Sequence, residues 1–433
     1  MARRSGEHAV VLGAGIGGLL AARVLTDFYD RVTLVERDPL DGDGPRRGVP
    51  QGFHAHALLP RGLQAIEELF PGLSAEMAAG GAVPYEMIAD IRMIMGGHEF
   101  ARTPTGARGV SATRPFLEDH VRRRARALDR LTVADRTQVT GVVTGPGRVA
   151  GVRVAGAGGE RELAADLVVD AMGRGGRTLA WLDEMGFDRP EEETVRVEVA
   201  YSTWYLRIPG QALNGDRMII IGTHPGHLKG AALCAVEGDR WLVTLCGSAG
   251  VRPPDDPEGF FSWLDEAAPA DVARAVRQGE PLGGIGTVRV PTSVRRRYER
   301  LDRFPEGLLV VGDAVCNFNP IYGQGMTIGA LGALALRDCL RDGTDDLARR
   351  HFAAAAAVLD PAWRMSTGAD LALREAGERR TPGSRLLDGY LRRMQRVAGR
   401  DPEVAVAFSR VSGLYDPPSA LMRPAVLWKV LRG

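Results

Sequence analysis

A glycine-rich turn near the N-terminus is the first group of residues whose spacing could support chemistry. The segment Gly13-Ala14-Gly15-Ile16-Gly17-Gly18 follows the short apolar run Ala9–Leu12 and opens a helical pattern. In such a turn the first glycine permits a tight bend, the second lets backbone N–H groups approach a pyrophosphate, and the third lets helix and strand pack closely. Glu36 ends the next predicted strand, where an acid can accept hydrogen bonds from ribose hydroxyls. The predicted dinucleotide-binding residues are therefore Gly13, Gly15, Gly18 and Glu36.

A second glycine-rich segment lies far along the chain. The apolar strand Leu308–Val311 leads into Gly312-Asp313, and the stretch from Pro320 to Gly325 opens a predicted helix. Asp313 can accept a hydrogen bond from a ribityl hydroxyl. Free N–H groups at a helix start favour the anionic N1/O2 edge of a reduced isoalloxazine ring. Together the two segments indicate FAD, with its ADP half at the first and its flavin half at the second.

The elements that must position these segments follow an α/β order. Short apolar strands at His8–Leu12, Arg31–Val35 and Leu167–Asp170 are typical of a buried parallel sheet. Strand-like segments between Val195 and Leu245 are separated by turns and predict a mostly antiparallel sheet. We therefore expect a discontinuous Rossmann-like FAD-binding domain (1–85, 105–185 and 295–345), a β-sheet substrate-binding domain (86–104 and 186–294) and a helical C-terminal region (346–433) that caps the cavity.

Several local elements are also predicted. Glycine pairs between short apolar runs indicate hairpins. Apolar residues at helical spacing indicate helices. The hairpins are expected at Asp90–Ile94 with His98–Arg102 and at Gly151–Ala155 with Arg161–Ala165, and the helices at Ile16–Phe28, Gly62–Phe70, Pro115–Leu128, Phe260–Val276 and Met326–Arg341.

Composition limits the possible partners and compartments. The 433 residues are 45% hydrophobic and 25% charged with a formal net charge of +1, so no overall field favours nucleic acid. No stretch approaches the roughly 20 apolar residues of a membrane helix, so stable membrane insertion is not expected. The four cysteines show no C-x-x-C spacing, which predicts reduced thiols, no zinc site and a cytoplasmic location. Cys316 is interpreted as a packing residue.

With these motifs, the chain resembles the FAD-dependent monooxygenases that share the para-hydroxybenzoate hydroxylase fold. Among them it most resembles the actinobacterial branch that contains the polyether epoxidases of lasalocid and monensin biosynthesis. The resemblance implies FAD, O2 as co-substrate and an organic substrate over the flavin face, with oxygen transferred from a flavin C4a-hydroperoxide. Alkene epoxidation is the leading expectation. The motifs that carry the resemblance are Val11–Gly18, Arg47–His56, Asp166–Gly175 and Gly312–Met326.

The same resemblance implies roles for individual residues. Its loop near the flavin corresponds to Arg46, Arg47, Gln51, His54 and His56. The cofactor-binding residues that it implies are Arg37, Arg47, Gln51, Arg114, Val139, Asp170, Gly173, Gly312, Asp313, Gly323, Gln324, Gly325 and Met326. The residues expected beside the reacting flavin edge are Pro320, Gly323, Gly325 and His54. The His54-x-His56 pair alone does not indicate a metal, because no third ligand follows at usable spacing.

One motif departs from the family pattern. Asp170-Ala171 stands where the family has Asp-Gly, a motif that helps to bind FAD and NAD(P)H, and Gly176 stands where serine is common. This departure leaves the electron donor open. NADPH or NADH acting directly and a separate flavin reductase as a protein partner are both compatible with the sequence.

The substrate and the reaction also leave alternatives. Tyr201, Trp204, Tyr205 and Trp241 are expected to form an apolar roof for a polyketide, terpenoid or aromatic substrate, and core packing is the alternative for each. The alternative reactions are phenol hydroxylation, prenyl-lipid reduction and a non-redox cyclisation with bound FAD. The family's halogenases need a lysine in the flavin domain, and this chain has no lysine before Lys229.

Overall fold

A parallel sheet forms one end of the molecule. The computed structural model describes residues 4–42, 44, 50–56, 58–374 and 382–433. The strand order is β18 (Leu308–Val310), β11 (Leu167–Asp170), β1 (Gly6–Leu12), β2 (Tyr29–Val35) and β7 (Leu131–Ala134). The register pairs Leu12 with both Val35 and Asp170, and Asp170 with Val310. These strands therefore end level, and the segments that follow them meet at one edge of the sheet.

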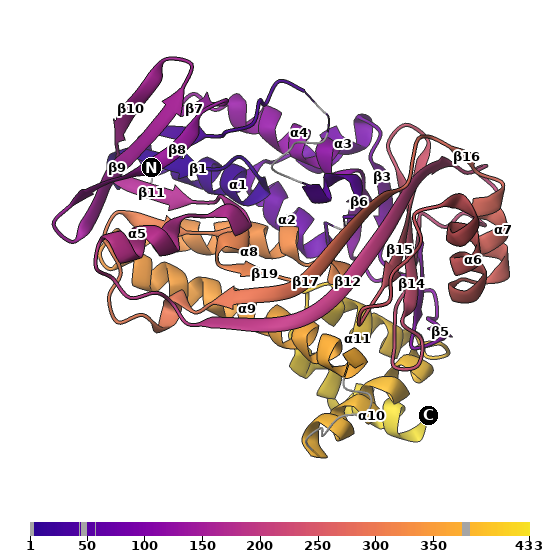
Figure 1. The fold of residues 1–433 in the computed structure, drawn as a ribbon. Coiled ribbons are helices and arrows are strands. Elements are labelled where there is room, and N and C mark those ends of the chain that lie inside the picture. Colours follow the sequence, from indigo (N-terminus) through magenta and orange to yellow (C-terminus); the bar gives the residue numbers. More distant parts are fainter. Residues whose placement is uncertain (1–3, 43, 45–49, 57, 375–381) are drawn as a thin grey trace.

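Helices and a small sheet cover the two faces of this parallel sheet (Figure 1). One face carries α1 (Ile16–Leu25), α2 (Pro60–Leu69), α3 (Leu73–Ala79), α4 (Arg114–Arg126) and α8 (Gly325–Arg341). Side chains of the other face pack against α5 (Thr178–Glu184) and a sheet of β8 (Gln138–Gly145), β9 (Arg148–Gly156) and β10 (Gly159–Ala164). The α1 helix ends three residues before the expected Phe28.

A large mixed sheet extends away from the parallel sheet. Its order is β19 (Cys316–Asn317), β17 (Gly286–Arg296), β12 (Glu192–Arg207), β15 (Arg240–Gly247), β14 (Lys229–Val236), β13 (Met218–Ile221), β4 (Ile91–Met95) and β5 (His98–Glu99), with β16 (Glu280–Pro281) beside β12. The β12–β17 ribbon runs along the molecule from the parallel sheet towards the far end (Figure 1). A separate pair is formed by β3 (Val83–Glu86) and β6 (Arg108–Ser111).

Two helices cover the outer face of the mixed sheet. The expected single helix over Phe260–Val276 is in fact α6 (Pro257–Ala267) and α7 (Ala270–Arg277). Pro269 stands at the N-cap of α7, where a residue without an amide hydrogen ends one helix and starts the next. Both predicted hairpins are confirmed as β4–β5 and β9–β10.

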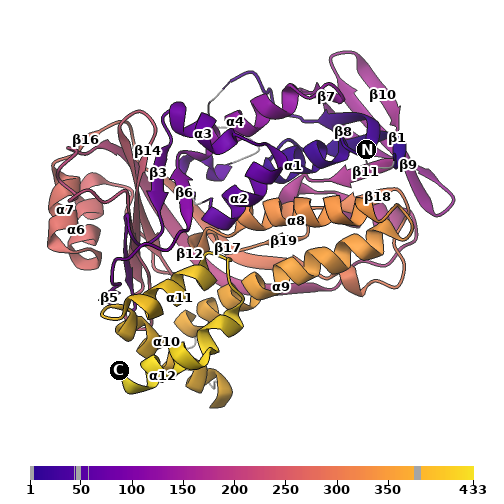
Figure 2. The same cartoon turned by 180° about the vertical axis from the view of Figure 1, so that it is seen from behind.

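The C-terminal region is helical, as expected. It contains α9 (Leu347–Arg374), α10 (Pro382–Ala398), α11 (Pro402–Ser412) and α12 (Pro424–Arg432). Figure 2 shows α9 running beside α8, with α10 and α11 beneath the mixed sheet. An ion pair and a hydrogen bond fix α9 to the β12–β17 ribbon, because Asp360 lies 2.6 Å from Arg295 and the Trp363 indole N–H donates to Glu193 at 3.0 Å. None of the helices in the described ranges is both long and apolar enough to cross a membrane.

Candidate functional site

The first glycine turn is closed on one side and open on the other. Gly13 has a φ of +99°, and a Cβ on Gly18 would lie only 1.9 Å from the Gly13 carbonyl oxygen. By contrast, a Cβ on Gly15 would meet nothing within 4 Å. The Glu36 carboxylate accepts a hydrogen bond from the Ala14 N–H at 2.8 Å and so braces the turn. Gly18 is therefore required for packing, whereas Gly15 leaves open backbone for a ligand.

The second glycine segment lies against the first. A Cβ on Gly17 would stand 3.8 Å from the Gly312 Cα atom, although the two residues are far apart in sequence. Gly312 itself has a φ of +64° and open space around it. The exposed Asp313 follows, and Arg114 and Arg174 lie close enough to act electrostatically on its carboxylate. The two segments thus lie side by side at one edge of the parallel sheet.

The loop that follows the second glycine segment has a polar atom without a partner. We call residues Asn319–Gln324 the flavin-side loop; it turns at Gly323, whose φ is +64°. One buried oxygen of this loop, Gln324 Oε1, has no hydrogen-bond partner within the part of the chain that the structure describes. A buried polar atom without a partner is costly, so a ligand is expected to satisfy it. Open backbone at Gly15 and Gly312 together with this unpartnered oxygen fits FAD.

Asp170 has a more structural position than the resemblance implied. Its side chain is fully buried and accepts hydrogen bonds from the Thr178 hydroxyl at 2.5 Å and the Met172 N–H at 2.9 Å. A Cβ on Gly176 would come within 2.9 Å of its carboxylate. Burial raises the pKa of Asp170, and the two hydrogen bonds oppose that shift. The Thr178 hydroxyl therefore satisfies the buried Asp170 carboxylate. Through its bond to the Met172 N–H, Asp170 also holds the turn after β11 that carries Gly173.

The remaining predicted cofactor residues lie on several different elements. Val139 packs in the core with Leu12 and Val35, at the ends of β1 and β2. Arg37 is exposed just after β2, and Met326 is buried in the first turn of α8. Gln51 lies in the short 3-10 turn Pro50–Phe53, where only its backbone is described. Arg46 and Arg47 lie outside the described residues.

His54 is neutral and held by a hydroxyl chain. Its Nδ1 lies 2.8 Å from the Thr203 hydroxyl, which in turn lies 2.8 Å from the Thr244 hydroxyl. Burial lowers the pKa of His54 to about 4. Burial and the nearby Arg114 lower the pKa of His56 to about 3. Across the described parts of the chain, no three His, Cys, Asp or Glu side chains gather closely enough to hold a metal ion.

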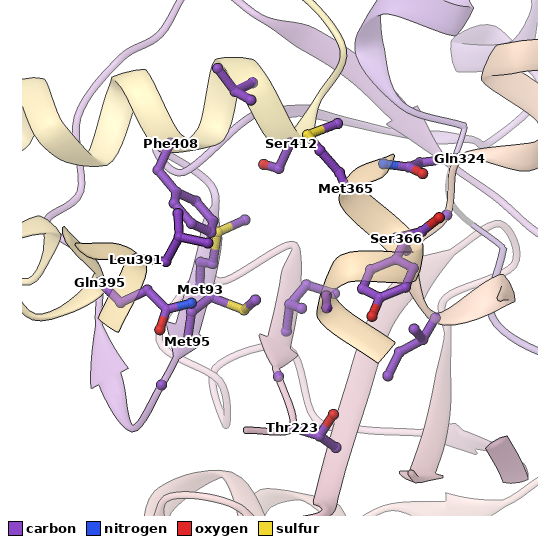
Figure 3. Close-up of a pocket in the computed structure, with 18 of the residues that line it drawn as sticks. Met93, Met95, Thr223, Gln324, Met365, Ser366, Leu391, Gln395, Phe408 and Ser412 are labelled. Carbon is purple, nitrogen blue, oxygen red and sulfur yellow. The ribbon is translucent and has the colours of Figure 1, made fainter. Parts of the chain in front are cut away.

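A cavity of about 1260 Å³ opens beside the flavin-side loop. It lies between that loop, the inner face of the mixed sheet and the C-terminal helices (Figure 3). In Figure 3 Gln324 and Ser366 lie on one side of the space, and Leu391, Gln395 and Phe408 on the other. Six of the twelve methionines line it, namely Met87, Met93, Met95, Met218, Met365 and Met422. Methionine is flexible and polarisable, so this lining suits an irregular apolar ligand.

The expected aromatic roof requires a correction. Side chains alternate between the faces of a strand, so Tyr201 and Trp204 on β12 point in opposite directions. Tyr201 lines the cavity, whereas Trp204 and Trp241 pack in the core beneath α6. Tyr205 shares the face of Tyr201 but stacks edge-on against Phe53, with ring centroids 5.1 Å apart, and does not line the cavity. The sequence identified the aromatic residues but not the face on which each lies.

The cysteines are buried in this arrangement. All four are free thiols in the structure. Burial raises the pKa of Cys316, so its thiol stays protonated. Cys316 belongs to the core cluster between β18, α8 and α9. It is a packing residue.

Sequence reasoning missed one buried carboxyl group near the site. Asp370 on α9 is 3% exposed and accepts hydrogen bonds from Asn319 and Tyr322 of the flavin-side loop. It lies in an Arg- and Ala-rich helix with no recognisable motif. The methionines escaped notice for a similar reason, although the cluster of three between Met87 and Met95 was a visible signal.

Comparisons with known proteins identify the family of the chain. Residues 7–342 match the family model described as FAD binding domain. Protein Rv3254 of Mycobacterium tuberculosis (strain ATCC 25618 / H37Rv) is 36% identical over 446 residues, which cover 97% of this chain and 92% of that protein.

Solved structures at lower identity share the fold. The flavin-dependent brominase Bmp2 is 16% identical with a TM-score of 0.70 and covers 99% of this chain and 100% of its own. The p-nitrophenol 4-monooxygenase PnpA from Pseudomonas putida DLL-E4 is 17% identical with a TM-score of 0.64, covering 96% and 99%. PqsL, a probable FAD-dependent monooxygenase from Pseudomonas aeruginosa, is 18% identical with a TM-score of 0.63, covering 86% and 99%. With this fold, the adjacent glycine segments and the family match, the chain belongs to the FAD binding domain family.

Proposed function

We propose that this protein is a flavin-dependent monooxygenase that inserts one oxygen atom of O2 into an apolar natural-product substrate. The observation that carries the proposal is the methionine-lined cavity of about 1260 Å³ that opens onto the flavin-side loop. Bound FAD, once reduced, would supply the activation of O2, which protein side chains cannot provide. The chain's own residues would bind the substrate, orient it and exclude water.

Alkene epoxidation is the reaction that the lining favours. The cavity lining is largely apolar, and Met, Ile, Leu and Ala side chains are prominent in it. The two histidines of the lining that come from the loop before α2, His54 and His56, are neutral because burial lowers their pKa values to about 4 and about 3. Oxygen transfer to an electron-rich alkene needs no side-chain acid or base, so a largely apolar lining with neutral imidazoles suits it. Polyketide and terpenoid chains are the substrate classes of matching chemistry.

Phenol hydroxylation is the second candidate, and one observation favours it. The Tyr201 hydroxyl and the Asp370 Oδ2 atom are buried without hydrogen-bond partners among the described residues. Tyr201 lines the cavity, so a hydroxyl-bearing aromatic substrate could pair with its free hydroxyl. PnpA, which shares the fold, is named as a p-nitrophenol 4-monooxygenase.

Halogenation has less support, although Bmp2 shares the fold. Lys229 and Lys429 are the two lysines of the sequence. Lys229 forms an ion pair with Glu266 on α6, and Lys429 pairs with Asp401 in the C-terminal helices. Neither lysine lines the cavity. The halogenase lysine that the resemblance would require therefore has no counterpart in either one.

The test is oxygen uptake coupled to product mass. The purified protein is supplied with FAD and reduced by NADPH, by NADH or by a separate flavin reductase, and challenged with a panel of polyenes and phenols under 18O2. We expect a product heavier by one 18O atom, formed only with a reductant and O2. Turnover without O2 would contradict oxygen insertion and favour alkene reduction or cyclisation. Labelled products from phenols alone would replace epoxidation by the second candidate.

A further inference from the structure

Asp370 connects the C-terminal helix α9 to the loop where the flavin is expected. Its Oδ1 atom accepts a hydrogen bond from the Asn319 side-chain amide at 2.7 Å and from the Tyr322 hydroxyl at 2.8 Å. Asn319 uses its own side-chain oxygen to cap Ile321 N–H at 3.1 Å. One carboxylate thus holds both ends of the short 3-10 turn that leads into Gly323 and Gln324. Asp370 lies beyond residue 342, where the family match ends.

Asp370 is also unusual in its surroundings. Three titratable side chains lie close enough to interact electrostatically with the Asp370 carboxyl group, namely Tyr322 of the flavin-side loop, Tyr201 on β12 and Cys246 on β15. Burial raises the pKa of each of these three groups, so they remain neutral near neutral pH. Burial also raises the pKa of Asp370 to about 6, and the hydrogen bonds from Asn319 and Tyr322 oppose that rise. Asp370 is therefore the member of this group whose charge changes in the neutral range.

We propose that Asp370 is a positioning residue for the flavin-side loop, and that its ionisation increases the affinity of the protein for FAD. The ionised carboxylate is the stronger acceptor for Asn319 and Tyr322, because hydrogen bonds to a charged acceptor are shorter and stronger than neutral ones. The protonated form keeps weaker bonds and leaves the loop less firmly held. This inference rests on FAD binding at the two glycine segments and does not depend on which substrate is oxygenated.

The experiment measures FAD affinity as a function of pH. Protein stripped of FAD is titrated with oxidised FAD, and binding is followed by the quenching of FAD fluorescence between about pH 5 and about pH 8. For the unaltered protein we expect the affinity to rise about tenfold over this range, with a midpoint near the pKa of Asp370. Asp370→Asn should retain the shape of the side chain and lose this pH dependence.

Two further variants complete the test. Tyr322→Phe removes one of the two hydrogen bonds from the loop side and should reduce the pH dependence; it carries the test if Asp370→Asn does not fold. Asp346→Asn changes an exposed carboxyl group just before α9 and should behave as the unaltered protein. A flat profile in the unaltered protein, or an unchanged profile in Asp370→Asn, would overturn the proposal. Because no turnover is measured, failure here leaves the oxygenase proposal separately testable.

Discussion

The cofactor side and the cavity side of this molecule are specified in opposite ways. On the cofactor side, FAD binding depends on backbone atoms that stay uncovered because residues such as Gly15 and Gly312 have no side chain. On the cavity side, side chains from strands and helices far apart in sequence, such as Met93, Met365 and Phe408, surround a shared space (Figure 3). The first region is fixed by local steric requirements. The second exists only after the mixed sheet and the C-terminal helices have packed together.

This difference implies different tolerance to change. A glycine that approaches another backbone atom allows no replacement, whereas a methionine lining can repack around a new shape. On the cofactor side, a single substitution is therefore expected to cause a large loss of FAD binding. On the cavity side, substitutions are expected to change substrate selectivity by degrees. The variants below test this expectation, starting with the largest effect.

The two helix-turn glycines should separate folding from cofactor binding. In Gly18→Ala the new Cβ would lie 1.9 Å from the Gly13 carbonyl oxygen, so we expect destabilisation of at least about 3 kcal/mol. In Gly15→Ala the Cβ meets no protein atom within 4 Å, so the fold should persist while FAD binding weakens strongly. Thermal unfolding and FAD titration of both variants check this. A Gly15→Ala protein that binds FAD normally would contradict the placement of the pyrophosphate.

Filling the cavity should lower turnover without affecting FAD binding. Met93 lies in the middle of the lining in Figure 3, on strand β4. Met93→Trp should lower kcat/KM by at least about tenfold because it occupies substrate volume. FAD affinity should stay unchanged, since β4 does not reach the glycine segments. Met93→Leu is the matched control and should alter selectivity among substrates more than rate. An equal loss of FAD affinity in Met93→Trp would mean that the cavity and the FAD site are not separate.

The same contrast explains what the sequence could predict. The glycine turns and the strands that lead into them were recognisable because the glycine spacing has a steric reason. That Tyr201 and Trp204 lie on opposite faces of β12 follows from their odd spacing and was overlooked; which of the two faces the cavity depends on how the mixed sheet packs and could not be predicted from the sequence. The role of Asp370 was hidden as well, since it depends on the docking of α9 against the flavin-side loop. The division between α6 and α7 could have been predicted from Pro269 itself, but it was overlooked.

Asp370→Asn should raise stability at neutral pH while weakening FAD binding. The pKa of Asp370 is raised by burial to about 6, so the group contributes most to folding below about pH 4 and its contribution is lost as pH rises through about 6. The loss amounts to about 3 kcal/mol by neutral pH. Asp370→Asn has no carboxyl group to ionise at this position, so it does not undergo this loss of stability. Its free energy of unfolding relative to the unaltered protein should therefore grow between about pH 4.5 and about pH 7.5 in denaturant titrations. A constant difference would show that the carboxyl group does not titrate in the folded state.

Tyr201→Phe is the mildest change and addresses the chemistry of the cavity. The Tyr201 hydroxyl is buried without a partner among the described residues, so its removal should alter stability by no more than about 0.5 kcal/mol, or stabilise the protein. Thr203→Val is the contrasting variant, because Thr203 links His54 and Thr244 through hydrogen bonds, and its loss should cost about 1 to 3 kcal/mol. Turnover then distinguishes the two candidate reactions. If the substrate is an alkene, Tyr201→Phe should keep its kcat/KM; if it is a phenol held by the free hydroxyl, kcat/KM should fall about tenfold, a loss of one hydrogen bond.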